Sequence, residues 1–141
     1  MSIDKTLFDR LGGFDTLKKV HRIFYDRLFA HPWLKHYFIE HPQEIFENQQ
    51  TTFMAKLMGG PNTYAGLTPK IAHQNIFITD ELFETRSGIL SESIKAAGIS
   101  DGLREEWLDA DRSLKASLVK TSVEECRTMY PGQTIYDIPK P

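Results

Sequence analysis

The chain has 141 residues, a length that favours one domain with a core large enough to need no disulfide or metal for folding. Seventeen basic residues face nineteen acidic ones, and the net charge of −2 excludes the strongly basic surface that nucleic acid or an anionic membrane would require. No apolar run could cross a bilayer, no secretory signal is recognisable, and the single cysteine, Cys126, cannot form an internal disulfide. We therefore expect a cytoplasmic protein without nucleic-acid or membrane partners.

The first half of the chain has the pattern of three helices. Apolar residues recur at helical spacing in each of them, and glycine or proline stands where each is expected to stop. In chain order we expect a short helix capped by Ser2 and stopped by Gly12-Gly13, a helix over about 14–30, an irregular turn over 32–38, and a helix that starts at Pro42 and ends at Gly59-Gly60.

The second half begins with the longest break in the pattern, the stretch GGPNTYAGLTPKIAHQNIFI over residues 59–78. Within it, Thr68 and Pro69 predict the start of a short helix that carries His73. Thr79 is expected to cap a longer helix that Gly98 ends. Ser100 is expected to cap one last long helix, whose inward side chains are Leu103, Trp107, Leu114 and Leu118.

No segment alternates with the period of a β-strand, so the predicted fold class is all-α. From about Arg127 the helical pattern stops and proline and glycine become frequent. We expect a helical domain over residues 1–126 and a tail over 127–141 that is extended or partly disordered. Ile135 and Tyr136 are the side chains that could dock this tail on the domain.

Three polar residues interrupt apolar helix faces. Gln50 shares a face with Phe46, and it is either a core glutamine bonded to a backbone carbonyl or a donor aimed into a pocket; Gln49, at the edge of that face, could share either role. Tyr25 flanks the apolar stripe of the second helix, and its hydroxyl either reaches solvent or enters the same pocket. A polar group in such a place needs a partner, and a ligand is one.

His73 is the third of these residues, and it stands among apolar neighbours after the long break. It is either a core histidine with a satisfied hydrogen bond or a ligand, and a single neutral imidazole is sufficient to hold a haem iron. The chain contains no HExxH or CxxC motif, no phosphate-binding loop and no nucleophile–base pair. An enzyme that uses only side-chain chemistry is therefore not supported.

Four stretches make the chain resemble the truncated haemoglobins, compact bacterial and plant globins, over residues 6 to about 120. They are TLFDRLGG near the start, FYDRLFAHPWLKHYF at 24–38, FMAKLMGGPNTYAG at 53–66 and PKIAHQNIFITDELF at 69–83. Their order and spacing are similar to those of the family, and AHQNIFIT is most similar to its first group. The resemblance implies a shortened globin fold in which two helices pack over two and enclose haem b.

The resemblance also implies roles for single residues. His73 matches the proximal histidine that binds iron, Tyr25 matches the tyrosine that faces the bound ligand, and Gln50 matches a distal position, with Gln49 beside it. Arg86 stands where the family usually has an apolar or tryptophan residue, and it either reaches a propionate, enters the distal pocket or is a surface arginine. The remaining cofactor-binding residues implied are Phe38 against the porphyrin, Phe46 at the position where longer globins carry a distal histidine, Phe24, Phe53, Met54 and Ile78 around the cavity, and Tyr64 and Lys70 at the haem edge.

The function that the resemblance implies is reversible binding of oxygen, with nitric oxide and carbon monoxide as related ligands. Hydrogen bonds from Tyr25 and Gln50 would slow oxygen release, which suits nitric oxide dioxygenation with an external electron-donating reductase. Two alternatives remain at this point: an oxygen or redox sensor or ligand store without turnover, and a haem-free globin-like interaction domain. In each case we expect a monomer or a weak dimer.

Overall fold

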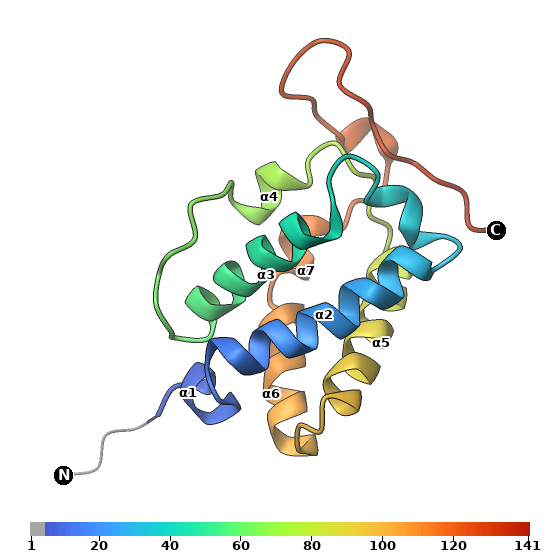
Figure 1. Ribbon diagram of the computed structural model, residues 1–141. Coiled ribbons are helices and arrows are strands. Elements are labelled where there is room, and N and C mark those ends of the chain that lie inside the picture. The colour runs from blue at the N-terminus through green and yellow to red at the C-terminus, as the bar shows by residue number, and fades with distance from the viewer. Residues whose placement is uncertain (1–4) are drawn as a thin grey trace.

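The computed structural model describes residues 5–141, and Figure 1 shows that α2 and α3 lie side by side across a second pair formed by α5 and α6. The described chain contains no strand, only an isolated parallel bridge between Ile76 and Tyr136, so the predicted all-α class is confirmed. The helices are α1 (Leu7–Leu11), α2 (Phe14–Ala30), η1 (Leu34–Tyr37), α3 (Gln43–Leu57), α4 (Pro69–Ala72), α5 (Asp80–Ala96), α6 (Asp101–Arg112), α7 (Lys115–Leu118) and η2 (Val123–Glu125).

The core lies between the two helix pairs. Leu17, Val20 and Phe24 on α2 are inaccessible to solvent, as is Trp107 on α6, and Phe83 on α5 is 1 % exposed. The three α2 residues, Leu17, Val20 and Phe24, are three and four positions apart, which is the spacing that places them on one helix face. None of the helices in the described part of the chain is both long and apolar enough to cross a membrane.

Local capping chemistry sets the helix ends. The expected cap at Ser2 lies outside the described residues; α1 begins after Thr6, whose hydroxyl accepts a hydrogen bond from the Asp9 backbone at 3.1 Å. α3 ends before Gly59, which has a φ of +87° that other residues rarely adopt. A Cβ on Gly60 would come within 2.5 Å of the Phe8 ring, so this glycine lets the chain pass close to α1.

The predicted last long helix is divided into α6 and α7, which is a correction to the sequence-based expectation. The Ser113 hydroxyl donates to the Ala110 carbonyl at 2.6 Å, and the Leu114 backbone N–H bonds instead to the Asp111 carbonyl at 3.1 Å. A hydroxyl that occupies a helix carbonyl competes with the regular i→i+4 ladder. The helix therefore tightens and stops at Ser113 without any proline or glycine.

Residues 127–141 leave the segment that joins α4 to α5, turn at Tyr130–Gln133 and return to that segment at Tyr136. The Tyr136 backbone donates to the Asn75 carbonyl, and its own carbonyl accepts from Phe77, both at 2.8 Å. The Tyr136 ring is buried, whereas Ile135 is exposed. At its far end the tail reaches Trp33, whose indole N–H donates to the Ile138 carbonyl at 2.8 Å.

Candidate functional site

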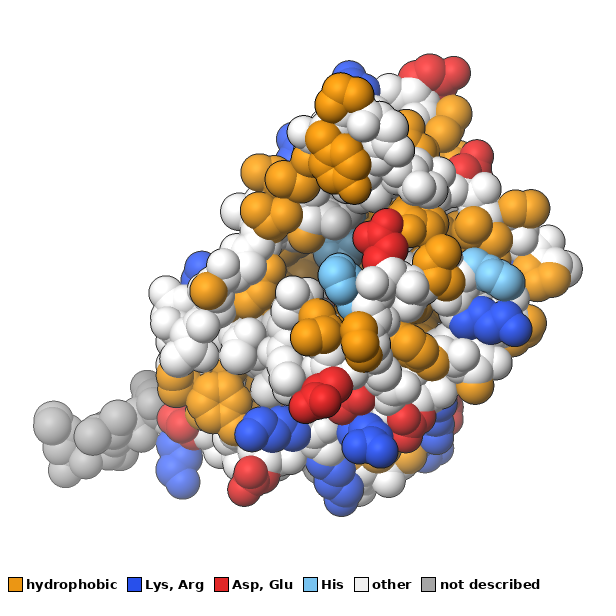
Figure 2. All heavy atoms as spheres, turned by 45° about the horizontal axis from the view of Figure 1, so that its top comes forward, with side chains coloured by type: hydrophobic (Ala, Val, Ile, Leu, Met, Phe, Trp, Pro, Cys, Tyr) orange, Lys and Arg blue, Asp and Glu red, His pale blue; other side chains and the backbone are white. Residues whose placement is uncertain are grey.

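A cavity of about 490 Å³ opens beside the core, a volume typical of small-molecule and cofactor sites. Its walls come from α2, α3, α4, α5, α7 and the tail, so segments far apart in the sequence enclose it. Figure 2 shows a hollow on this face of the molecule, with apolar and histidine side chains gathered around it. Aromatic rings form much of the lining, and a few polar groups converge on the interior.

Most of the predicted site residues meet at this cavity. His73, Tyr25, Gln49, Gln50 and Arg86 all line it. The aromatic and apolar lining that the sequence analysis named consists of Phe38, Phe46, Phe53, Tyr64 and Ile78.

Two of the residues expected to line the cavity are placed elsewhere, which corrects that expectation. Phe24 and Met54 are fully buried in the core behind the lining, because their positions on α2 and α3 point toward the other helices. Lys70 on α4 is exposed, and it is not among the residues that line the cavity.

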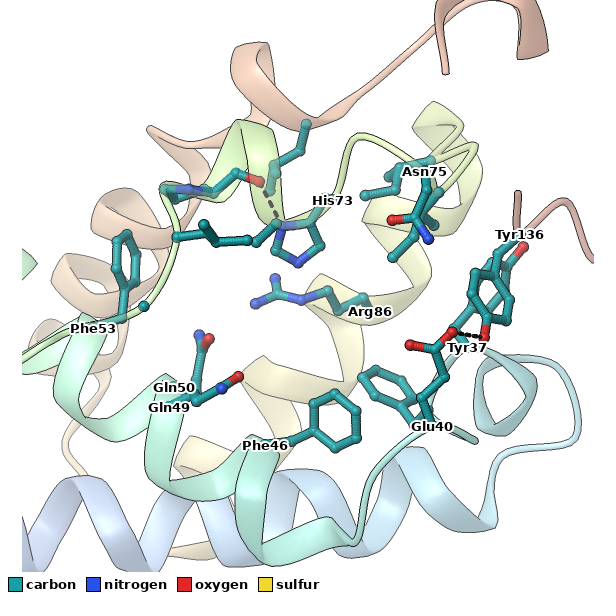
Figure 3. A pocket seen from close by; sticks show the side chains of 18 of the residues that line it. Tyr37, Glu40, Phe46, Gln49, Gln50, Phe53, His73, Asn75, Arg86 and Tyr136 are labelled. Atoms are coloured by element: carbon teal, nitrogen blue, oxygen red, sulfur yellow. Dashed lines mark hydrogen bonds between the residues drawn. The ribbon is translucent and has the colours of Figure 1, made fainter. Parts of the chain in front are cut away.

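His73 directly follows α4 and acts as its C-cap residue, so it stands one residue beyond the short helix that was expected to carry it. Its Nδ1 lies 2.7 Å from the Pro69 carbonyl oxygen. A backbone carbonyl only accepts, so Nδ1 carries the proton and donates, and the lone pair is left on Nε2. Figure 3 shows the ring directed into the cavity.

The surroundings keep the His73 imidazole neutral. Burial is the main cause that lowers its pKa below the usual value, and the positive charges of Arg86 and Lys120 act in the same direction. The Lys120 ammonium also donates to the His73 backbone carbonyl at 3.1 Å. A neutral, oriented imidazole with a free Nε2 is the form of histidine that binds a metal.

Aromatic side chains hold Tyr25 in the opposite wall. Its ring stacks on Phe46, with the ring centroids 6.2 Å apart, and meets the Phe38 ring edge to face at a centroid distance of 5.9 Å. Burial raises the pKa of its hydroxyl well above the usual range, so this group remains protonated and able to donate. Tyr64, in contrast, donates its hydroxyl to the Leu67 carbonyl at 2.5 Å.

The two glutamines come from α3. Figure 3 shows Gln49 and Gln50 on the wall across the cavity from His73. Gln50 is partly buried and Gln49 is exposed, as their neighbouring positions at the edge of one helix face require. Their amides are donors and acceptors that need no proton transfer to serve either role.

Arg86 enters the cavity from α5, so the interpretation of this residue as a surface arginine is wrong. Its Nη1 and Nη2 bond to the two carboxylate oxygens of Asp111 at 2.8 and 3.0 Å. Asp111 on α6 was missed in the sequence, although its position four residues after Trp107 on the same face was a signal for a buried acid.

The mouth of the cavity contains a group of contacts whose partners the sequence did not reveal, although Tyr136 was named as a side chain that could dock the tail. The Tyr136 hydroxyl donates to the Glu40 carboxylate at 2.5 Å, and the Asn75 amide donates to the Thr134 carbonyl at 3.0 Å. Tyr37 donates to the Ile138 carbonyl at 3.3 Å. These contacts fix the tail beside the opening, where Thr134 meets Asn75, two residues after His73.

Comparisons with known proteins agree on one family. The model of the bacterial-like globins matches residues 6–119. A group 1 truncated haemoglobin from Mycolicibacterium paratuberculosis is 32 % identical over 74 % of this chain and 77 % of its own length. Another from Tetrahymena pyriformis is 29 % identical over 75 % of this chain and 88 % of its own.

Solved structures show the same fold. The Fe(III) form of the truncated haemoglobin from Tetrahymena pyriformis superposes with a TM-score of 0.75 at 26 % identity, covering 83 % of this chain and 100 % of that one. A group II truncated haemoglobin from Bacillus anthracis superposes with a TM-score of 0.77 at 20 % identity, covering 85 % and 95 % of the two chains. At that identity the second match shows the fold alone.

Proposed function

The chain belongs to the group 1 truncated haemoglobins of the bacterial-like globin family, and we propose from this membership that it holds haem b in the cavity and binds small diatomic gases. The observation that carries the proposal is His73. Its ring is neutral, oriented by the Pro69 carbonyl and directed into a 490 Å³ cavity. A globin needs one such axial ligand.

The residues present fit a flat, largely apolar cofactor. Phe38 and Phe46 meet edge to face at 5.2 Å, and Phe53 and Tyr64 do the same, so aromatic rings line both ends of the α3 wall. His73 would hold the iron through Nε2. Lys70 is exposed on α4, where it would pair with a haem propionate in solvent. Bound haem iron supplies an open position at which a diatomic gas binds reversibly.

Tyr25 and Gln50 would stabilise the ligand from the opposite wall, with Gln49 beside them. The high pKa of Tyr25 keeps its hydroxyl a donor, and amide N–H groups donate at every pH. Hydrogen bonds to an acceptor with partial negative charge contribute about 1.5–3 kcal/mol. Oxygen, which gains such charge when it binds, should therefore leave slowly.

Stopped-flow measurement of oxygen release tests this assignment. Tyr25→Phe should release oxygen faster by about tenfold to a hundredfold, because it loses the donor and keeps the ring. Tyr64→Phe is the matched control, since Tyr64 lines the same cavity but donates its hydroxyl to Leu67. Equal release rates in wild type and Tyr25→Phe would show that the Tyr25 hydroxyl does not donate to the bound oxygen.

Slow release suits a protein that consumes its bound ligand, and we propose nitric oxide dioxygenation as the reaction. In this reaction oxygen and nitric oxide would combine to nitrate with one electron from the ferrous haem, and an external reductase would replace that electron. Supplying the oxygen-bound protein with nitric oxide and a reductase distinguishes a nitric oxide dioxygenase from a sensor or ligand store. Nitrate that accumulates over many turnovers supports the reaction, and its absence supports the store or sensor.

A further inference from the structure

Arg86 brings a positive charge into the interior of the cavity. In Figure 3 its side chain extends into the space between His73 and the two glutamines of α3. Among the described residues that line the cavity, Glu40 is the only acidic one, and its carboxylate accepts the Tyr136 hydroxyl at the mouth. The guanidinium therefore faces an interior whose other polar groups are neutral.

Asp111 holds this guanidinium in place. The carboxylate, 2 % exposed, accepts two parallel hydrogen bonds in the fork geometry that suits arginine. Burial opposes the charge on Arg86, but Asp111 more than offsets it and the net effect raises the Arg86 pKa. The guanidinium carbon also lies over the rings of Phe24 and Phe83, 5.4 and 5.8 Å from their centroids, and these cation–π contacts help to stabilise the charge.

The pairing with Asp111 leaves part of the guanidinium available. A guanidinium has five N–H groups, and the two bonds to Asp111 use two of them. The Arg86 side chain is 24 % exposed to solvent. Because Arg86 lines the cavity and protein surrounds it on other sides, we take this exposed surface to face the cavity. Its charge also reaches both walls, since it lowers the pKa of His73 and acts to lower that of Tyr25 against the larger effect of burial.

We propose that Arg86, fixed by Asp111, makes this cavity select small monovalent inorganic anions over neutral ligands of similar size. The proposal rests on the proposed function, because these ligands would bind in the haem-loaded pocket. An anion gains a charge-assisted hydrogen bond and the attraction of a partly desolvated cation, whereas a neutral ligand gains neither to the same extent. The preference is expected to be about tenfold to a hundredfold in affinity.

Azide and imidazole are the probes. At about pH 8 azide is an anion and imidazole is neutral, so titrating the hemin-loaded ferric protein and its variants with each shows whether a change in affinity depends on the charge of the ligand. The double variant Arg86→Gln/Asp111→Asn removes both charges and avoids leaving a buried carboxylate without its partner. It should bind azide about tenfold to a hundredfold more weakly and imidazole within about threefold of wild type.

Two further variants control the experiment. Asp111→Asn keeps the cation but loses the two-bond contact that fixes it, so azide should bind more weakly than in wild type and more tightly than in the double variant. Arg10→Gln removes an arginine that makes the same two-bond contact with Glu106 on the surface, and both affinities should stay unchanged. Far-ultraviolet circular dichroism confirms that each variant is folded.

Three results would overturn the proposal. Equal azide affinity in wild type and the double variant would show that the guanidinium does not meet the ligand. Unchanged azide affinity together with faster hemin loss would show that Arg86 serves a carboxylate of the cofactor instead. Failure of wild type to take up hemin would overturn the proposed function as well, so the two failures are distinguishable.

Discussion

At the scale of single residues, His21 is a neutral imidazole at the centre of the core. It is inaccessible to solvent, its Nδ1 lies 2.7 Å from the Thr51 hydroxyl oxygen, and its ring meets Trp107 edge to face at 5.7 Å. Its Nε2 and the Trp107 indole nitrogen lack a hydrogen-bond partner in the described chain. Burial, with a contribution from the charge of Arg86, lowers the His21 pKa to about 3.

This low pKa predicts that acid destabilises the fold through His21. Above the unfolded-state pKa of about 6.5 both states are neutral, and between 6.5 and 3 only the unfolded state takes up the proton. The contribution of the neutral His21 to the free energy of unfolding is therefore complete above pH 6.5 and declines as the pH falls below it. Between pH 7 and pH 5 the loss should be about 2 kcal/mol.

Urea denaturation at both pH values, in the same hemin-loaded state, measures this loss. His21→Gln cannot take up a proton at this position and should lose about 2 kcal/mol less than wild type over that range. The comparison uses the change with pH, so a lower overall stability of the variant does not affect it. An identical pH dependence in the two proteins would contradict the assignment.

The sequence contained part of the information about these buried polar groups. His21 lies four residues after Leu17 and three before Phe24, and Asp111 lies four after Trp107, so helical spacing alone marks both as inward-facing. Their partners could not be predicted in this way. Thr51 and Arg86 stand on other helices, and only the packing of α3 and α5 brings them into contact.

At the scale of elements, the helices with strong local signals were predicted well. α2 matches its expected range of about 14–30, and α5 begins after Thr79, whose hydroxyl accepts from the Leu82 backbone at 3.1 Å. Caps and glycine stops act within a few residues, which is why sequence shows them. The break between α6 and α7 depends on one serine hydroxyl and carries no such signal.

The tail is the element about which periodicity says least, because it contains no helix over residues 127–141. Its contacts are nonetheless specific. The Tyr136 ring is buried, and its backbone pairs with residues 75 and 77 beside the proposed iron ligand. Burial first, and then the Glu40 carboxylate, raise the pKa of the Tyr136 hydroxyl to about 12, so this group stays a donor.

These contacts predict that the tail slows the loss of haem. Tyr136→Ala removes a buried ring and the bond to Glu40, and it should speed hemin loss about fivefold to tenfold because the mouth of the cavity opens. Transfer of hemin to excess apomyoglobin measures the rate. Tyr130→Ala, at a tyrosine of the same tail that is 60 % exposed, should lose hemin like wild type. Equal rates in both variants would contradict the prediction.

At the scale of the whole molecule, one cavity is assembled from segments that span most of the chain. Tyr25 comes from α2, Gln50 from α3, Arg86 from α5, and Tyr136 from the tail. Four ordered sequence stretches were sufficient to predict the fold and most of the lining. The pairing of Arg86 with Asp111 and the partners of Tyr136 depend on contacts across the fold, and residue patterns did not reveal them, although they did mark Tyr136 as a possible docking residue.

The central claim is that His73 holds a haem in this cavity, and a hemin titration followed by absorption spectroscopy tests it most directly. Wild type should develop a strong Soret band that saturates at about one hemin per chain. His41→Ala, which removes the other histidine that lines the cavity, should keep that band, and His73→Ala should lose most of it. No hemin uptake by wild type, or an unchanged spectrum in His73→Ala, would contradict the account.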